Sequence, residues 1–108
     1  MASLSITPAS GSITAKSSVC RIDATGAPAN TLVGYDPVKY PSSPAIVYYL
    51  LIDSPVGTDD GKSYLFTTAS DGTHAVNNYT FPIAGSYTLR LRDNVDDSDK
   101  ATLSVTVS

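Results

Sequence analysis

The fold of this chain is decided by one stretch, Phe81-Pro82-Ile83-Ala84-Gly85-Ser86-Tyr87-Thr88-Leu89-Arg90-Leu91-Arg92-Asp93. Apolar and polar residues alternate through its second half, which places Tyr87, Leu89 and Leu91 on one face of an extended strand. Ser, Thr and Arg occupy the positions between them and would face the other way. This alternation is typical of a half-buried strand, and we predict that it forms the central strand of a β-sandwich.

The composition of the chain favours β-structure throughout. It contains 15 Ser and 12 Thr but no Glu, Gln or Trp, and 42% of its residues are hydrophobic. Ser and Thr suit the solvent face of strands, and strong helix formers are few. Its 108 residues match one domain and leave no room for a second core, so we expect a single all-β domain over residues 1–108.

The charge and the cysteine content argue against several classes of partner. A net charge of −3, with 7 Lys and Arg scattered along the chain, provides no basic stripe for a nucleic-acid backbone. Cys20 is the single cysteine, so no intrachain disulfide can form. No charged-then-apolar leader is visible, and no apolar run approaches the ~18 residues of a membrane span. We therefore expect neither nucleic-acid nor membrane binding, and a core held together by packing alone.

The rest of the chain divides into about seven strands separated by Gly-, Pro- and Asp-containing turns. They are Ser3 to Pro8, Ser18 to Thr25, Ala45 to Asp53, Ser63 to Thr68, Thr73 to Phe81, the strand opened by Tyr87, and a last strand with Ala101, Leu103, Val105 and Val107 facing inward. In the second strand, Cys20, Ile22 and Ala24 should face the core. In the fifth, alternation places Ala75, Asn77, Tyr79 and Phe81 on one side. The first and last strands should be sheet edges, with Ile13 continuing the first.

Three parts of the sequence resemble known β-sandwich modules. Leu4-Ser5-Ile6-Thr7-Pro8 and Ile22-Asp23-Ala24-Thr25-Gly26 resemble the opening strands of bacterial immunoglobulin (Ig)-like domains, and Tyr79 to Asn94 is similar to the end of a PKD-type domain. A Gly two residues before Tyr87 is also similar to the tyrosine corner of Ig-like folds, where the Tyr hydroxyl bonds the upstream backbone. The resemblance implies an Ig-like antiparallel β-sandwich, of the kind used in bacterial surface proteins and in the virions of tailed phages.

The segment from Ala27 to Pro44 differs from the strands around it because four prolines interrupt it. Long connections without clear periodicity in a small domain are usually functional or mobile, and prolines restrict their alternatives. Tyr35 and Tyr40 lie in this segment, and we predict that they form a partner-binding surface. The alternative is that both rings cover the open end of the sandwich, because aromatic side chains usually contribute to burial.

Residues that could carry chemistry are few. His74 is the single histidine, no Gly-x-Ser-x-Gly elbow is present, and one His with one Cys cannot build a zinc site. Asp93, Asp96, Asp97 and Asp99 could supply hard oxygen ligands to Ca²⁺, although they do not match the EF-hand spacing. An acidic loop is more often a solvated turn, so we predict no catalytic residue, no metal and no cofactor, and we expect that the protein is not an enzyme.

Three functions are compatible with these observations. The first is a decoration protein on the surface of a tailed-phage virion, bound to the major capsid protein or another virion protein; a start without a leader, one reduced cysteine and a complete sandwich fit assembly in the cytoplasm. The second is a spacer or adhesion domain of a bacterial surface or secreted protein. The third is a carbohydrate-binding module that binds a host surface glycan with Tyr35, Tyr40, Tyr48 or Tyr49 as stacking platforms. We expect the first.

Overall fold

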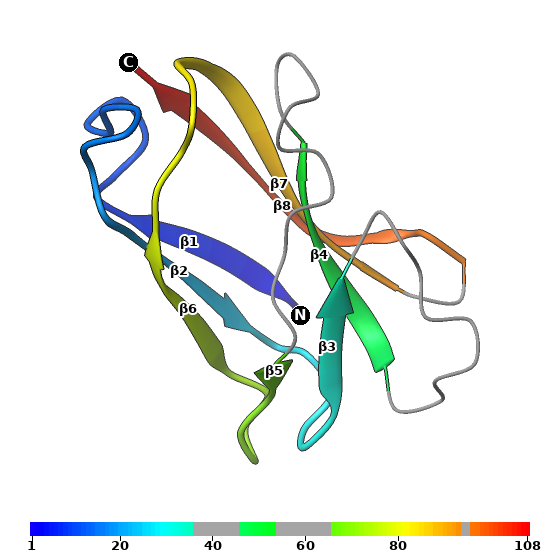
Figure 1. Cartoon of the computed structure of the whole chain (residues 1–108). Coiled ribbons are helices and arrows are strands. Elements are labelled where there is room, and N and C mark those ends of the chain that lie inside the picture. The colour runs from blue at the N-terminus through cyan, green and yellow to red at the C-terminus, as the bar shows by residue number, and fades with distance from the viewer. Residues whose placement is uncertain (36–45, 54–65, 94–95) are drawn as a thin grey trace.

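The computed structural model describes residues 1–35, 46–53, 66–93 and 96–108 (Figure 1). This part of the chain contains eight strands and no helix, which confirms the all-β prediction. The strands are β1 (Ser3–Thr7), β2 (Cys20–Thr25), β3 (Leu32–Tyr35), β4 (Ile46–Asp53), β5 (Phe66–Thr67), β6 (His74–Tyr79), β7 (Gly85–Asp93) and β8 (Asp99–Val107). Nothing in the described ranges is a helix long and apolar enough to cross a membrane.

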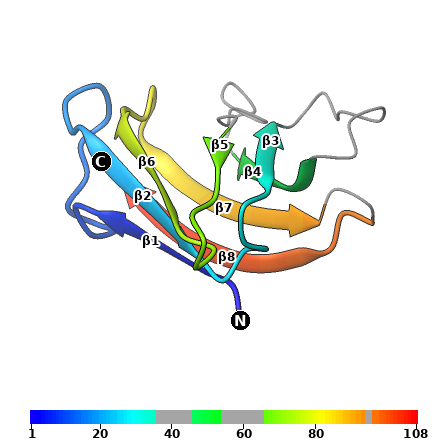
Figure 2. The ribbon, with the colours of Figure 1, turned by 90° about the horizontal axis from the view of Figure 1, so that it is seen from below.

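The strands form two sheets that share one core. A three-stranded antiparallel sheet has the order β1-β2-β6, and a five-stranded sheet has the order β5-β3-β4-β7-β8. All neighbours in the larger sheet are antiparallel except β3 and β4, which run parallel. Figure 1 shows β1, β2 and β6 on the left and β3 and β4 on the right, and Figure 2 shows β7 and β8 as long neighbouring strands. The arrangement is that of a β-sandwich.

Strand β7 lies between β4 and β8, as its alternating pattern predicts. Tyr87 is 1% exposed, and Leu89 and Leu91 are fully buried, while the residues between them are partly exposed. Buried residues of the facing sheet, among them Cys20, Ile22 and Ala24, belong to the same core. The inward positions of β8 follow the prediction too: Val105 and Val107 are buried, and Ala101 and Leu103 pack partly buried against the core. The central assignment and these inward faces are confirmed.

The turn before β7 is tied back to the strand by Tyr87. The Tyr87 hydroxyl donates a hydrogen bond to the Ile83 carbonyl oxygen at 2.7 Å. Phe81 packs between two other rings, with centroids 4.6 Å from Tyr87 and 4.8 Å from Tyr79. The hydroxyl of a buried tyrosine needs such a partner, so this bond lets the ring stay in the core. The predicted bond from Tyr87 to the upstream backbone is confirmed.

Strand β6 does not follow the predicted alternation. Val76 and Tyr79 are both buried although they are three residues apart, and Asn77 and Asn78 are both exposed. The reason is a β-bulge: Cys20 pairs with Tyr79 and Ile22 pairs with Val76, so Arg21 alone faces two residues of β6. Asn78 adopts a φ of 61°, a left-handed conformation that Asn tolerates better than most residues. The prediction that Asn77 shares a face with Tyr79 was therefore wrong.

We expected the connection from Ala27 to Pro44 to contain no strand, and this expectation was wrong. The connection contains β3, whose Leu32 pairs with Ile46 and whose Tyr35 pairs with Leu50. The run Leu32-Val33 is short but suited to a strand, and it finds a partner in β4, so tertiary pairing decides the outcome. This strand raises the number from about seven to eight. Residues 36–45, which include the remainder of the predicted connection, lie outside the described part of the chain.

The predicted edges are confirmed, and one of them is partly covered. Strands β1 and β8 each end a sheet. Ile13 forms an isolated parallel bridge with Val107, and the Gly11 amide donates to the Thr106 carbonyl oxygen at 3.1 Å. The segment after β1 therefore leaves the smaller sheet and pairs with the last strand of the larger one. Because β1 and β8 belong to different sheets, this segment joins the two layers along one side.

Candidate functional site

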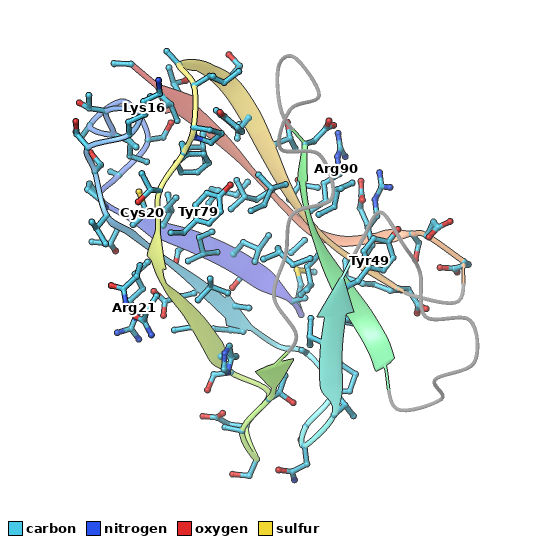
Figure 3. The ribbon with its side chains drawn as sticks, viewed as in Figure 1. Lys16, Cys20, Arg21, Tyr49, Tyr79 and Arg90 are labelled. Atoms are coloured by element: carbon cyan, nitrogen blue, oxygen red, sulfur yellow. The ribbon has the colours of Figure 1, made fainter. Side chains whose placement is uncertain are left out.

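The richest group of charged side chains lies on the outer face of the five-stranded sheet. Because Leu89 and Leu91 point into the core, the alternation of β7 turns Arg90 and Arg92 outward. Arg92 is paired in register with Tyr49 of β4 on one side and with Asp99 of β8 on the other. These three residues form a row across three strands, and we call this the Asp99–Arg92–Tyr49 row. Figure 3 shows Tyr49 and Arg90 on the same side of the molecule.

Asp99 is held by both arginines. Its Oδ1 accepts from Arg92 Nε at 2.7 Å, and its Oδ2 accepts from Arg90 Nη1 at 2.8 Å. The hydrogen bond from Arg92, together with the positive charge of both guanidinium groups, lowers the pKa of Asp99, and the same bond raises the pKa of Arg92. The Asp99 side chain is still 35% exposed, so solvent screens these ion pairs and each contributes ~0–1 kcal/mol.

Tyr49 is the buried member of the row, with 1% of its surface exposed. Its hydroxyl donates to Asp97 Oδ1 at 2.7 Å. Burial raises the pKa of Tyr49 to about 12, and the neighbouring Asp97 carboxylate adds to the effect because it stabilises the protonated phenol. The Asp97 amide in turn donates to the Asp93 carbonyl oxygen at 3.0 Å. Asp97 therefore links the turn between β7 and β8 to strand β4.

The acidic residues of this turn do not converge on one point. Asp99 binds the arginines, Asp97 binds Tyr49, and Asp96 Oδ1 accepts from the Ser98 amide at 3.0 Å. The bond from Ser98 lowers the pKa of Asp96. Within residues 1–35, 46–53, 66–93 and 96–108, no three His, Cys or Asp side chains gather as metal ligands would. Each of these three carboxylates accepts a hydrogen bond from a donor of the protein itself.

The histidine and the cysteine belong to the other sheet. His74 begins β6 and pairs with Ala24, and its side chain is half-buried. Cys20 begins β2 and is buried in the core, where burial raises the pKa of its thiol. A thiol with a raised pKa is protonated at neutral pH and is a poor nucleophile. Both residues therefore lie on a different sheet from the arginine and tyrosine side chains of β7 and β4.

Of the two tyrosines that were predicted to contact a partner, the structure describes only the backbone of Tyr35. Tyr35 ends β3, so its backbone belongs to the five-stranded sheet and is not part of an irregular connection. Tyr40 lies outside the described residues. The prediction that they form a partner-binding surface therefore stays a prediction. The structure changes the placement of Tyr35, which lies on β3. One strand, β4, separates β3 from β7, the strand that carries Arg92.

Sequence reasoning missed the Asp99–Arg92–Tyr49 row. A signal was present, because the alternation of β7 already sends Arg90 and Arg92 to the outer face. The partner of these arginines could not be found in the same way, since it depends on the register between β7 and β8. Tyr49 was hidden for another reason: β4 is apolar on both faces, so its pattern does not show which of two adjacent tyrosines faces the core.

Comparison with known proteins brings no match. No protein-family model matches the chain, and neither a curated protein nor a solved structure is similar to it at a significant level.

Proposed function

We propose that this protein is an Ig-like, non-enzymatic docking module that decorates the surface of a tailed-phage virion. The attachment would be to the major capsid protein or to another protein of the capsid or tail. The observation that carries this proposal is that charged groups on the outer face of the five-stranded sheet bind one another, with Asp99 held by Arg90 and Arg92.

The strand pairing supports the Ig-like part of the proposal. Ig-like sandwiches place their first, second, fourth and fifth strands in one sheet and their third, sixth and seventh in the other. The sheets β1-β2-β6 and β4-β7-β8 match this arrangement except for the fourth strand, because β5 pairs with the additional strand β3 in the larger sheet. The bond from Tyr87 to Ile83 is what a tyrosine corner provides. The parallel pairing of β3 with β4 departs from the Ig pattern.

The electrostatics of the outer face support a non-catalytic role. General acid–base catalysis works best with a pKa near the working pH. Here the shifts move away from neutrality: the pKa of Asp99 is lowered, and that of Tyr49 is raised to about 12. Both groups therefore keep one protonation state across the physiological range. Such groups stabilise a surface and orient it for a partner.

The contact itself is proposed to rest on aromatic anchors. Binding energy in protein interfaces concentrates in a few residues, and Tyr supplies a large contact area at a small entropic cost. We keep Tyr35 and Tyr40 as these anchors, with Tyr35 on the same sheet as the Asp99–Arg92–Tyr49 row. The ion pairs of the row, which are partly exposed, would contribute to orientation and association rate more than to affinity.

The proposal is tested by co-sedimentation of the purified chain with tailed-phage particles that lack it. We expect saturable attachment to the particle. Replacing Tyr35 and Tyr40 together with Ala should weaken attachment by ~2–4 kcal/mol, the usual range for anchor residues. The matched control replaces both with Phe, which keeps the rings, and should retain most of the binding. A chain that stays in the supernatant with every particle would overturn the proposal.

The spacer or adhesion alternative predicts a different result. A spacer holds other domains apart and needs no particle of its own, so the isolated chain would attach to none. It would also be one segment of a longer bacterial surface or secreted protein. A single measurement of the length of the native polypeptide, by immunoblot of the source cells or particles, distinguishes this alternative from a decoration protein.

A further inference from the structure

The β-bulge in β6 brings together side chains that regular pairing would separate. In a regular strand, Asn77 and Asn78 would point to opposite faces of the sheet. The bulge instead leaves both exposed on the outer side, opposite the single residue Arg21 of β2. Bulges often re-aim side chains in this way beside functional sites. Figure 3 shows Arg21 at the opposite side of the molecule from Arg90 and Tyr49.

These side chains line a shallow groove of about 640 Å³ across all three strands of the smaller sheet. The residues that matter for recognition come from the end of β1, the start of β2 and the bulge: Pro8, Val19, Arg21, Asp23, Asn77 and Asn78. Val19 is 61% exposed, which is unusual for a large apolar side chain in this structure. The volume is within the range of about 300–1,000 Å³ that is common for small-ligand sites.

The polar groups of the groove have unused hydrogen-bonding capacity. Arg21 Nε binds Asp23 Oδ1 at 3.0 Å, which holds the two side chains side by side. The terminal nitrogens of Arg21, the second oxygen of Asp23 and both side-chain amides have no hydrogen bond within the described part of the chain. Each amide can donate and accept, so the groove offers several donors and acceptors to a ligand.

We propose that this groove binds a neutral oligosaccharide. The charges of Arg21 and Asp23 cancel, so the groove favours neither an anion nor a cation. A sugar hydroxyl both donates and accepts, and adjacent hydroxyls can satisfy an amide and the Arg–Asp pair together. Pro8 and Val19 provide apolar walls for the C–H face of the ring. The groove lies on the other sheet from the proposed docking face, so a particle-bound module could present it to a glycan.

A purely structural role for the bulge makes a different prediction. Bulges also protect edge strands against pairing with other chains, and β6 is the last strand of its sheet in the described part of the molecule. In that case the backbone of Asn78 would matter and its amide would not. The substitution Asn78→Gly separates the two roles, because Gly keeps the left-handed backbone and removes only the amide.

The test is titration of the ¹⁵N-labelled chain with neutral trisaccharides of glucose, galactose and mannose, followed by NMR chemical-shift mapping. Sialylated and sulfated glycans serve as the charged comparison, and an unstructured neutral peptide as the peptide comparison. We expect at least one neutral trisaccharide to shift the amide signals of Val19, Arg21, Asn77 and Asn78. The double variant Asn77→Ala/Asn78→Gly should lower that affinity about tenfold or more without a change in melting temperature.

Asn30→Gly is the matched control, because Asn30 is also exposed with a positive φ, of 53°, and does not line the groove. It should bind like the parent. The proposal is overturned if no neutral trisaccharide shifts these signals, if the charged glycans or the peptide bind instead, or if the double variant binds as tightly as Asn30→Gly. The outcome is independent of attachment to particles, which the co-sedimentation experiment measures.

Discussion

Strands β7 and β6 show two ways of keeping an apolar face buried. In β7 the buried residues follow one another at every second position, and Tyr87, Leu89 and Leu91 are almost inaccessible to solvent. In β6 the buried residues Val76 and Tyr79 are three positions apart, and a bulge restores the inward direction. Strand β7 produces an outer face of paired arginines and aspartates, and strand β6 contributes unpaired amides to a groove.

The difference follows from the place of each strand in its sheet. Strand β7 has neighbours on both sides, and an extra residue would disturb two ladders of hydrogen bonds at once. Strand β6 pairs only with β2 in the described part of the molecule, so a bulge disturbs one ladder. Strand β7 keeps its alternation, while the edge strand β6 departs from it and leaves two polar side chains exposed next to each other.

The largest effect should come from the core side of β7. Leu89→Ala removes a fully buried side chain and leaves a cavity, and we expect a loss of ~2–5 kcal/mol in the free energy of unfolding, measured with urea. Leu103→Ala on β8 is the control, because Leu103 is only partly buried and should cost clearly less. Equal losses for the two variants would contradict the contrast between a central and an edge strand.

The next effect tests the bulge of β6 directly. Asn78→Val places a β-branched residue at a φ of 61°, and we expect a loss of about 1–2 kcal/mol in stability. Asn78→Gly should cost little or nothing, since Gly adopts this conformation without strain. Val favours regular strands, so a stabilised Val variant in the same urea experiment would show that the bulge is absent in solution.

A smaller effect is expected at the turn that begins β7. Tyr87→Phe removes the hydroxyl that donates to Ile83 and leaves a partly buried carbonyl oxygen without this donor. The loss should be about 1 kcal/mol, and the fold should be retained. Circular dichroism checks the fold, and the urea midpoint measures the loss. An unchanged midpoint would mean that the bond does not help to hold the turn against β7.

The smallest effect concerns the outer face of β7. The pKa of Asp99 is lowered in the folded state, so its ion pairs stabilise the protein above the unfolded pKa of about 3.9 and lose that effect as the pH falls through the folded value. Asp99→Asn should therefore cost up to ~1 kcal/mol at neutral pH and nothing in strong acid. Thermal melts across this pH range measure it. High salt should reduce the difference, and a cost that persists in acid would exclude the ion pairs as its cause.

Only part of each candidate site could be predicted from the sequence. Alternation in β7 was enough to place Arg90 and Arg92 on an outer face, but Asp99 became their partner through the register of β7 with β8. Asn77 and Asn78 lowered the quality of the strand pattern, yet nothing in a single sequence shows that a bulge lies there. Asn, with its tolerance of positive φ, was the one available sign.

By itself, the sequence determined the all-β class, the central position of the strand that contains Tyr87, Leu89 and Leu91, and the inward faces of β2 and β8, because local alternation decides which side of a strand is apolar. Only the tertiary structure decided the pairing of β3 with β4, the bulge of β6 and the partners of Arg90 and Arg92. These depend on contacts between segments far apart in the chain. Such contacts are set by register and by edge or central position in a sheet, and local composition carries neither.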